Sequence, residues 1–102
     1  MPIISETARR DLVEIWSYVA EYDVESAHQV IKELAKKFEL LEANPKFGRT
    51  QDGLIVEIRL FPHKNYHIYY FSTENGVEIY RVLHGRRNAE DLFEEYFEGL
   101  NE

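Results

Sequence analysis

The sequence contains no cysteine among its 102 residues, and only one methionine and one tryptophan. The absence of cysteine excludes disulfide bonds, thiolate metal ligands and thiol nucleophiles, and it fits a reducing compartment. The sequence also lacks any run of about eighteen apolar residues, and it shows no signal-peptide pattern. We therefore expect a soluble cytoplasmic protein that has no membrane partner.

Basic residues are in short supply as well. Lysine and arginine number 12 against 19 aspartates and glutamates, which gives a net charge of −7 and argues against nucleic-acid binding through the field of the whole molecule. Residues 1–43 carry five basic and nine acidic side chains, and residues 89–102 carry six acidic side chains and no basic one. Residues 44–88 carry seven basic and four acidic side chains, so the positive charge is concentrated there, at a balance of +3.

Motifs that bind nucleotides or metals are missing too. There is no glycine-rich phosphate loop, no hydroxyl nucleophile in a recognisable context and no carboxylate pair with catalytic spacing. His28, His63 and His67 have no second ligand at the spacing of a metal site. We therefore expect no cofactor and no metal ion.

What the sequence does contain is enough apolar side chains for one core, since 44% of the residues are hydrophobic and 14% are aromatic. With no linker and no repeat, the chain is predicted to be a single domain spanning residues 1–102. Ser5 is a good N-cap for a first helix and Asp23 for a second, because apolar residues recur at helical spacing after each. The second helix should end at Asn44-Pro45, and so short a connection between the two predicts an antiparallel helical hairpin.

The hydrophobic period changes to two residues after this point, which indicates strands. The predicted elements are an edge strand at 2–4, a loop at 44–53, a strand at 54–61 halted by Pro62, a strand at 64–72, a hairpin turn at 73–76, a strand at 76–84 and a closing helix at 88–100. The fold class is therefore α+β: an N-terminal antiparallel helical hairpin packed on an antiparallel sheet of three to four strands, followed by a C-terminal helix.

Two arginines on the predicted strands are candidate binding residues. Simple alternation places Arg81 on an otherwise apolar side of its strand, where a guanidinium needs a partner, and Arg59 has a similar setting. One interpretation is an ion pair with Glu57 or Glu78, or exposure at a sheet edge. The other is a concave sheet face that presents both guanidinium groups to a carboxylate or a phosphate.

A histidine and two further arginines follow at the end of the strand, as His84, Arg86 and Arg87. Loops at strand ends often carry function, although two arginines near an acidic helix are more often simply solvated. The residues alone thus predict a small domain with a basic sheet face, and they do not specify a reaction.

Several motifs, in order along the chain, resemble the ParE branch of the RelE/ParE toxin superfamily, whose members include plasmid stabilisation proteins. The resemblance covers roughly residues 3–93, and its strength lies in the co-occurrence of the motifs at consistent spacing. The motifs are Ala8-x-x-Asp11-Leu12-x-x-Ile15-Trp16-x-Tyr18, Leu41-x-x-Asn44-Pro45-x-x-Gly48-Arg49, Glu57-Ile58-Arg59-x-Phe61-Pro62, Tyr66-x-Ile68-x-Tyr70 and Val77-Glu78-Ile79-x-Arg81-Val82-Leu83-His84-Gly85.

The resemblance implies two helices on a twisted antiparallel sheet and a bacterial type II toxin that a cognate antitoxin binds and neutralises. ParE-like members are taken to inhibit DNA gyrase without cleaving anything, whereas RelE-like members cut mRNA on the ribosome. Because the branches share one fold, the fold does not choose between them. A third alternative is a silenced member that only binds its antitoxin.

The RelE-like alternative would use Arg59, Arg81, His84 and Tyr96 as its catalytic residues, with the arginines at the phosphate and the other two moving protons. The acidic last helix and the net charge of −7 oppose RNA binding, so the gyrase branch is favoured. The residues expected to contact a partner, with antitoxin acids near the first two, are Arg59, Arg81, His84, Arg86 and Arg87. In the absence of the antitoxin, the same surface could mediate self-association.

Overall fold

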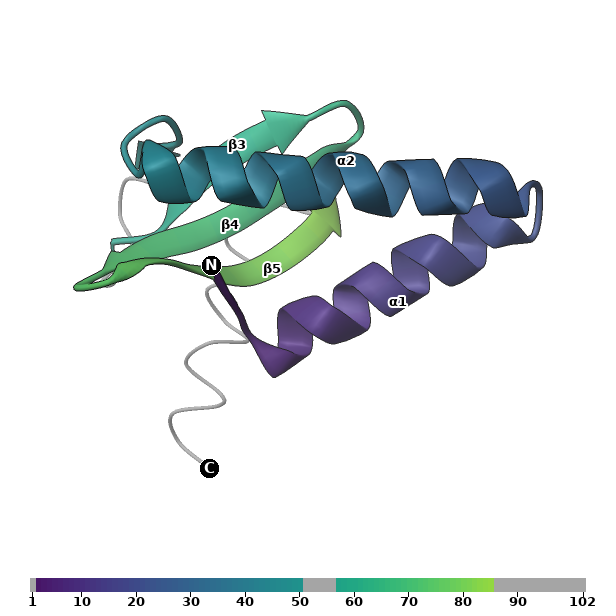
Figure 1. Ribbon diagram of the computed structural model, residues 1–102, viewed down its shortest axis with the longest axis horizontal. Coiled ribbons are helices and arrows are strands. Elements are labelled where there is room, and N and C mark those ends of the chain that lie inside the picture. The colour runs from purple at the N-terminus through teal and green to yellow at the C-terminus, as the bar shows by residue number, and fades with distance from the viewer. Residues whose placement is uncertain (1, 51–56, 86–102) are drawn as a thin grey trace.

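The computed structural model describes residues 2–50 and 57–85, and it forms two helices on a five-stranded sheet (Figure 1). The strand order is β1-β5-β4-β3-β2. The elements are β1 (Ile3–Ile4), α1 (Glu6–Ala20), α2 (Val24–Ala43), β2 (Arg49–Thr50), β3 (Arg59–His63), β4 (Tyr66–Thr73) and β5 (Gly76–His84). The α+β class and the helical hairpin are confirmed, and the predicted closing helix at 88–100 lies outside the described residues.

Both helices begin where the capping residues predict. The Ser5 hydroxyl accepts a hydrogen bond from the Ala8 N–H at 3.0 Å, and the Asp23 carboxylate accepts one from the Ser26 N–H at 3.3 Å. These bonds satisfy N–H groups that the first turn of a helix leaves without partners. The Ser26 hydroxyl also donates to Asp23, and this bond lowers the pKa of the carboxyl group. The part of the chain that the structure describes contains no helix long and apolar enough to cross a membrane.

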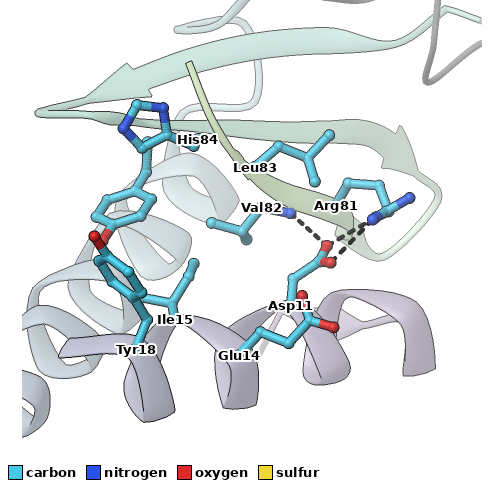
Figure 2. Close-up of a pocket in the computed structure, with 9 residues that line it drawn as sticks. Asp11, Glu14, Ile15, Tyr18, Arg81, Val82, Leu83 and His84 are labelled. Atoms are coloured by element: carbon cyan, nitrogen blue, oxygen red, sulfur yellow. Dashed lines mark hydrogen bonds and ion pairs between the residues drawn. The ribbon is translucent and has the colours of Figure 1, made fainter. Parts of the chain in front are cut away.

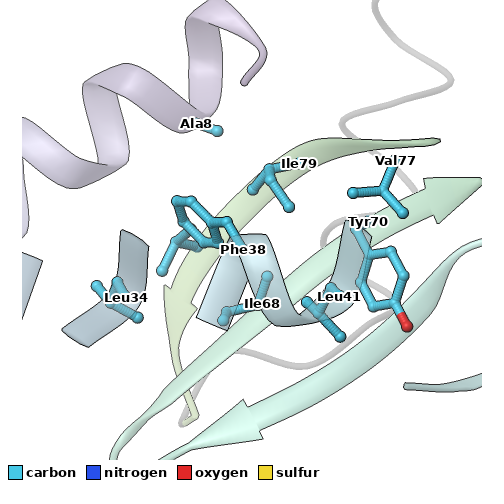
Figure 3. Close-up of a cluster of buried hydrophobic side chains, with 9 residues drawn as sticks. Ala8, Leu34, Phe38, Leu41, Ile68, Tyr70, Val77 and Ile79 are labelled. Atoms are coloured by element: carbon cyan, nitrogen blue, oxygen red, sulfur yellow. The ribbon is translucent and has the colours of Figure 1, made fainter. Parts of the chain in front are cut away.

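The main core lies between the helical hairpin and one face of the sheet (Figure 3). Each helix contributes its apolar stripe, and β4 and β5 contribute the buried side chains of the sheet face that the helices cover. Burying one large aliphatic side chain stabilises a fold by about 1.5–3 kcal/mol, so this layer holds the hairpin on the sheet. The buried members are Ala8, Leu34, Phe38, Leu41, Ile68, Tyr70, Val77, Ile79 and Val82.

The opposite face of the sheet is buried as well. Ile58, Leu60, Tyr69 and Leu83 form a second cluster, in which no side chain is more than 6% exposed. β5 therefore contributes buried apolar side chains to both faces of the sheet, and the strand predicted at 76–84 is confirmed.

Three strand predictions need correction. The strand predicted at 54–61 is β3, which begins at Arg59 and runs through Pro62 to His63, and the predicted residues 54–56 lie outside the described residues. Pro62 pairs with β4 on one side, while β2 pairs only with Arg59 and Leu60 on the other. A proline is tolerated where the ladder has a partner on one side only. The predicted loop at 44–53 contains the short strand β2, and β1 runs parallel to β5, whereas the three long strands are antiparallel as predicted.

A β-bulge in β5 changes which way its side chains point. Tyr70 pairs with Ile79 and Tyr69 pairs with Arg81, so Tyr80 is the extra residue that β5 inserts at this point of the register. Bulges commonly re-aim a side chain next to a functional site.

The bulge makes strict alternation wrong beyond Ile79. Ile79 and Val82, three residues apart, both lie in the cluster under the helices, whereas Leu83 lies in the cluster on the opposite face. Simple alternation predicts that Arg81 and Leu83 share a face. Because of the bulge they do not. Instead the Arg81 side chain reaches toward α1 (Figure 2).

Candidate functional site

A cavity of about 480 Å³ lies between α1 and the end of β5 (Figure 2). It has an apolar floor, an end with tyrosine and histidine rings, and an end with carboxylates and a guanidinium. In Figure 2, Tyr18 and His84 lie at one end, while Asp11, Glu14 and Arg81 lie at the other. The lining residues are Asp11, Glu14, Ile15, Tyr18, Tyr66, Arg81, Val82, Leu83 and His84.

The charged end is built on a buried ion pair between α1 and β5. Arg81 Nε donates to Asp11 Oδ2 at 2.8 Å, and Arg81 Nη2 donates to Asp11 Oδ1 at 3.0 Å. The two side chains are only 6% and 12% exposed, for Asp11 and Arg81 respectively. Two parallel bonds from one guanidinium to one carboxylate fix the orientation of both groups. The guanidinium is therefore committed to a partner within the protein.

Asp11 also closes an open strand edge. β1 pairs with β5 only at Glu78 and Ile79, so within residues 2–50 and 57–85 no strand lies beside the next residues of β5 on that side. The Ser5 hydroxyl donates to the Tyr80 carbonyl at 2.8 Å, and the Val82 N–H donates to Asp11 Oδ2 at 3.0 Å. Side chains thus satisfy backbone groups that an edge strand would otherwise expose.

The partner that sequence reasoning missed is Asp11. One of the two interpretations of the arginines named Glu57 or Glu78 as ion-pair partners, whereas the carboxylate that pairs with Arg81 lies 70 positions away in the sequence. A usable signal was present, because Asp11 follows Ala8 by three residues on the apolar stripe of α1, where a carboxylate needs a partner. Nothing in the sequence said that this partner was an arginine on the last strand.

Arg59 lies at a different place and lines a different cavity from Arg81. Its Nη1 donates to the Gly48 carbonyl at 2.8 Å, and its Nη2 lies 3.6 Å from Glu57 Oε1, which is one of the carboxylates that the ion-pair interpretation named. The side chain is 18% exposed. Arg59 therefore anchors the loop before β2, and the two guanidinium groups do not line a common cavity.

Tyr70, on β4, also holds the loop before β2. Its hydroxyl donates to the Pro45 carbonyl and accepts from the Gly48 N–H, each at 2.7 Å. Gly48 is packed so closely that an added Cβ would lie 2.5 Å from the Tyr70 hydroxyl oxygen. Burial raises the pKa of Tyr70, so the hydroxyl stays protonated and keeps both bonds at neutral pH.

The aromatic end of the cavity is formed by Tyr18, Tyr66 and His84. The rings of Tyr66 and His84 meet edge to face, with centroids 6.2 Å apart, and His84 is exposed. Burial raises the pKa of Tyr66, and the neighbouring Tyr18 hydroxyl adds to this shift. The Tyr66 hydroxyl therefore stays protonated at physiological pH. Arg86, Arg87 and Tyr96 lie outside the described residues.

His67 lies beside this end of the sheet, on β4. Burial lowers its pKa, and the positive charges of Arg49 and His84 act in the same direction. Its Nδ1 is buried and has no hydrogen-bond partner. Within residues 2–50 and 57–85, the structure brings no three histidine or acidic side chains together as a metal site would require.

Comparison with known proteins places the chain by sequence. Residues 3–89 match the family model described as ParE toxin of type II toxin-antitoxin system, parDE. The chain belongs to the ParE toxin family. The resemblance carried by the motifs is therefore confirmed over most of this ParE-family chain, including Asp11, Arg59, Arg81 and His84.

Individual ParE relatives are similar over nearly their whole length. Toxin ParE1 of Mycobacterium tuberculosis is 29% identical over 90 residues, which are 86% of this chain and 92% of that protein. Toxin ParE1 of Caulobacter vibrioides is 31% identical over 87 residues, which are 84% of this chain and 90% of that protein. A solved structure, the chromosomal ParDE TA system from P. aeruginosa, matches with a TM-score of 0.67 at 16% identity, covers 82% of this chain and 96% of that chain, and shows the same fold.

Proposed function

We propose that this ParE-family toxin is neutralised by a cognate antitoxin and acts by binding DNA gyrase stoichiometrically, without catalytic turnover. Family membership supports the toxin role, and the family to which the match belongs pairs a toxin with an antitoxin. The observation that carries the choice of mechanism is the bidentate ion pair between Asp11 and Arg81.

A metal-independent ribonuclease needs a cation at the scissile phosphate, together with a base and an acid. For Arg81 to offer a phosphate the two parallel N–H groups of its Nε–Nη2 edge, the phosphate would have to displace Asp11 from them. This would leave a buried carboxylate unpaired, at a cost of about 3–5 kcal/mol. Arg59 is held by the Gly48 carbonyl and lines another cavity. Both arginines therefore hold segments of the chain together. Binding of a protein surface suits the site better than cleavage at an RNA phosphate.

The residues proposed to face a partner are those around the cavity mouth. His84 is exposed at the end of β5, and Arg86 and Arg87 follow it in the sequence. Arg81 supports this region from within by fixing the end of β5 to α1, whereas Arg59 fixes the loop before β2 beside another cavity. An antitoxin segment that occupies the cavity would cover the exposed ring of Tyr18 and exclude water from the apolar floor.

The test is a pair of titrations with purified toxin. Supercoiling by gyrase should fall in proportion to added toxin, with an endpoint near one toxin per gyrase site, while mRNA on programmed ribosomes should stay intact. Replacing His84 or Tyr96 by phenylalanine should leave growth arrest nearly unchanged, because a stoichiometric inhibitor transfers no proton. In a nuclease, by contrast, loss of the general acid typically slows the reaction about a hundredfold or more. Substoichiometric mRNA cleavage that either phenylalanine variant abolishes would refute the proposal.

The second candidate is the ribosome-dependent endoribonuclease, and the observation in its favour is the exposed imidazole of His84 beside the Tyr66 ring. The two titrations separate this candidate from gyrase inhibition. Induced expression without antitoxin separates both from a silenced member, which would not arrest growth.

A further inference from the structure

The cavity beside α1 carries a carboxylate that is not balanced within the described part of the chain. Asp11 and Arg81 neutralise each other. Glu14 lies one helical turn further along α1, lines the same cavity, and has no ion pair or hydrogen bond among residues 2–50 and 57–85. Figure 2 shows its carboxylate at the charged end of the cavity. This end therefore attracts a positive charge from outside.

The other end offers an apolar ring to a partner. Tyr18 lines the cavity, yet the residue is 64% exposed. Exposed large aromatic side chains beside an apolar floor are typical of protein-binding sites, because covering them removes apolar area from water. Ile15, Val82 and Leu83 provide that floor.

Glu14 and Tyr18 are four positions apart on one helix, so their Cβ atoms are separated by about 5–6 Å on the same side. A second helix lying along α1 would repeat this spacing, since its residues three or four apart also lie on one face. One such residue would reach Glu14, and the other would cover Tyr18.

We propose that this cavity binds an amphipathic helix of the antitoxin that carries a lysine or arginine three or four residues from a large apolar side chain. The basic group pairs with Glu14, and the apolar side chain packs on Tyr18 and the floor. The inference rests on the proposed antitoxin partnership and specifies its chemistry. The sequence alone led us to expect an acidic antitoxin residue near Arg81, whereas the structure favours a basic one. The guanidinium that would attract an acid is already paired with Asp11.

The experiment measures the affinity of the toxin for the purified product of the neighbouring small open reading frame, at two salt concentrations. Glu14→Lys is compared with Glu21→Lys, which makes the same charge change on an exposed α1-flanking residue that does not line the cavity. Tyr18→Ala is compared with Val13→Ala, since Val13 is as exposed as Tyr18, lies on the same helix and does not line the cavity. Far-ultraviolet circular dichroism and urea midpoints verify that every variant is folded.

We expect Glu14→Lys to weaken binding about tenfold to a hundredfold, more strongly at low salt, and Tyr18→Ala to weaken it about tenfold or more. Both control variants should stay within about threefold of the unmodified toxin. Reversing the charge of the matching antitoxin residue to glutamate should restore affinity for Glu14→Lys and reduce it for the unmodified toxin.

Two results would overturn the inference, and they differ in meaning. If the unmodified toxin binds tightly and Glu14→Lys binds equally well, the cavity chemistry is wrong while the antitoxin partnership stands. If the unmodified toxin does not bind the neighbouring product at micromolar concentration, the partnership and the inference both fail.

Discussion

Replacing Asp11 by alanine should destabilise this fold by about 3–4 kcal/mol. The change removes one partner of an ion pair whose side chains are 6% and 12% exposed, and breaking such a pair costs about 3–5 kcal/mol. It also leaves the buried Val82 N–H without its acceptor, which by itself costs about 1–3 kcal/mol. The two costs overlap, because both arise from the same carboxylate, and water can partly hydrate the Arg81 guanidinium once Asp11 is gone. The expected loss is therefore smaller than the sum of the two ranges.

The measurement is equilibrium urea unfolding, with thermal unfolding as a second probe. For a domain of this length, a loss of about 3–4 kcal/mol lowers the melting temperature by roughly 15–25 °C. Asp11→Asn keeps one oxygen for the Val82 N–H, but it loses the charge and places an NH2 group where Oδ1 accepts from Arg81 Nη2. We therefore expect Asp11→Asn to cost less than Asp11→Ala while still destabilising the fold. Combining Asp11→Ala with Arg81→Met should cost clearly less than the sum of the two single changes, because no buried charge is left unpaired.

A matched control lies on the same helix. Glu6 pairs with Arg10 at 3.4 Å, but these side chains are 83% and 73% exposed, so Glu6→Ala should cost no more than about 0.5 kcal/mol. If Asp11→Ala were as mild as Glu6→Ala, the Asp11–Arg81 pair would not fasten α1 to β5, and the argument about the occupied guanidinium would fail with it.

Three further predictions concern other parts of the domain. Tyr70→Phe should cost about 2–3 kcal/mol in urea unfolding, because two buried backbone groups lose their partner, and Gly48→Ala should also destabilise, because its Cβ would collide with the ring. The bond from Lys64 lowers the pKa of Glu33 to about 2 from 4.5, so urea midpoints should fall as the pH drops from 4.5 toward 2, and Glu33→Gln should flatten that fall. Burial lowers the pKa of His67 from 6.5, so the folded state resists protonation; stability should decline as the pH falls below 6.5, and less so in His67→Gln.

The helices were predictable because their signals are local. Ser5 and Asp23 cap helices through N–H groups three residues away, and apolar residues recur within a few positions on one stripe. The hairpin of β4 and β5 was predictable for the same reason, since its turn residues are adjacent to the strands that they join. The edges of the sheet were less predictable. Whether Pro62 can lie within a strand depends on how far β2 extends beside it, which the local sequence does not show.

The site was only partly predictable, because two of its determinants are not local. A bulge depends on how β5 pairs with β4, and the sequence around Tyr80 contains no glycine that would mark it. The unmatched charges of Asp11 and Arg81 were each visible as polar groups on apolar faces. Joining them required the position of α1 relative to β5, which is set by the packing of the whole core.

The contacts that complete the cavity also set when the domain can fold during synthesis. Asp11 and Arg81 are 70 residues apart, and Ser5 and Tyr80 are 75 apart, so the first helix must wait for the last strand before either contact forms. Closing so long a loop costs entropy that is repaid only when distant segments meet, which slows folding. A growing chain cannot form the cavity until β5 has left the ribosome. Since the cavity assembles only at that stage, an antitoxin that recognises it would meet a nearly complete toxin and not a nascent one.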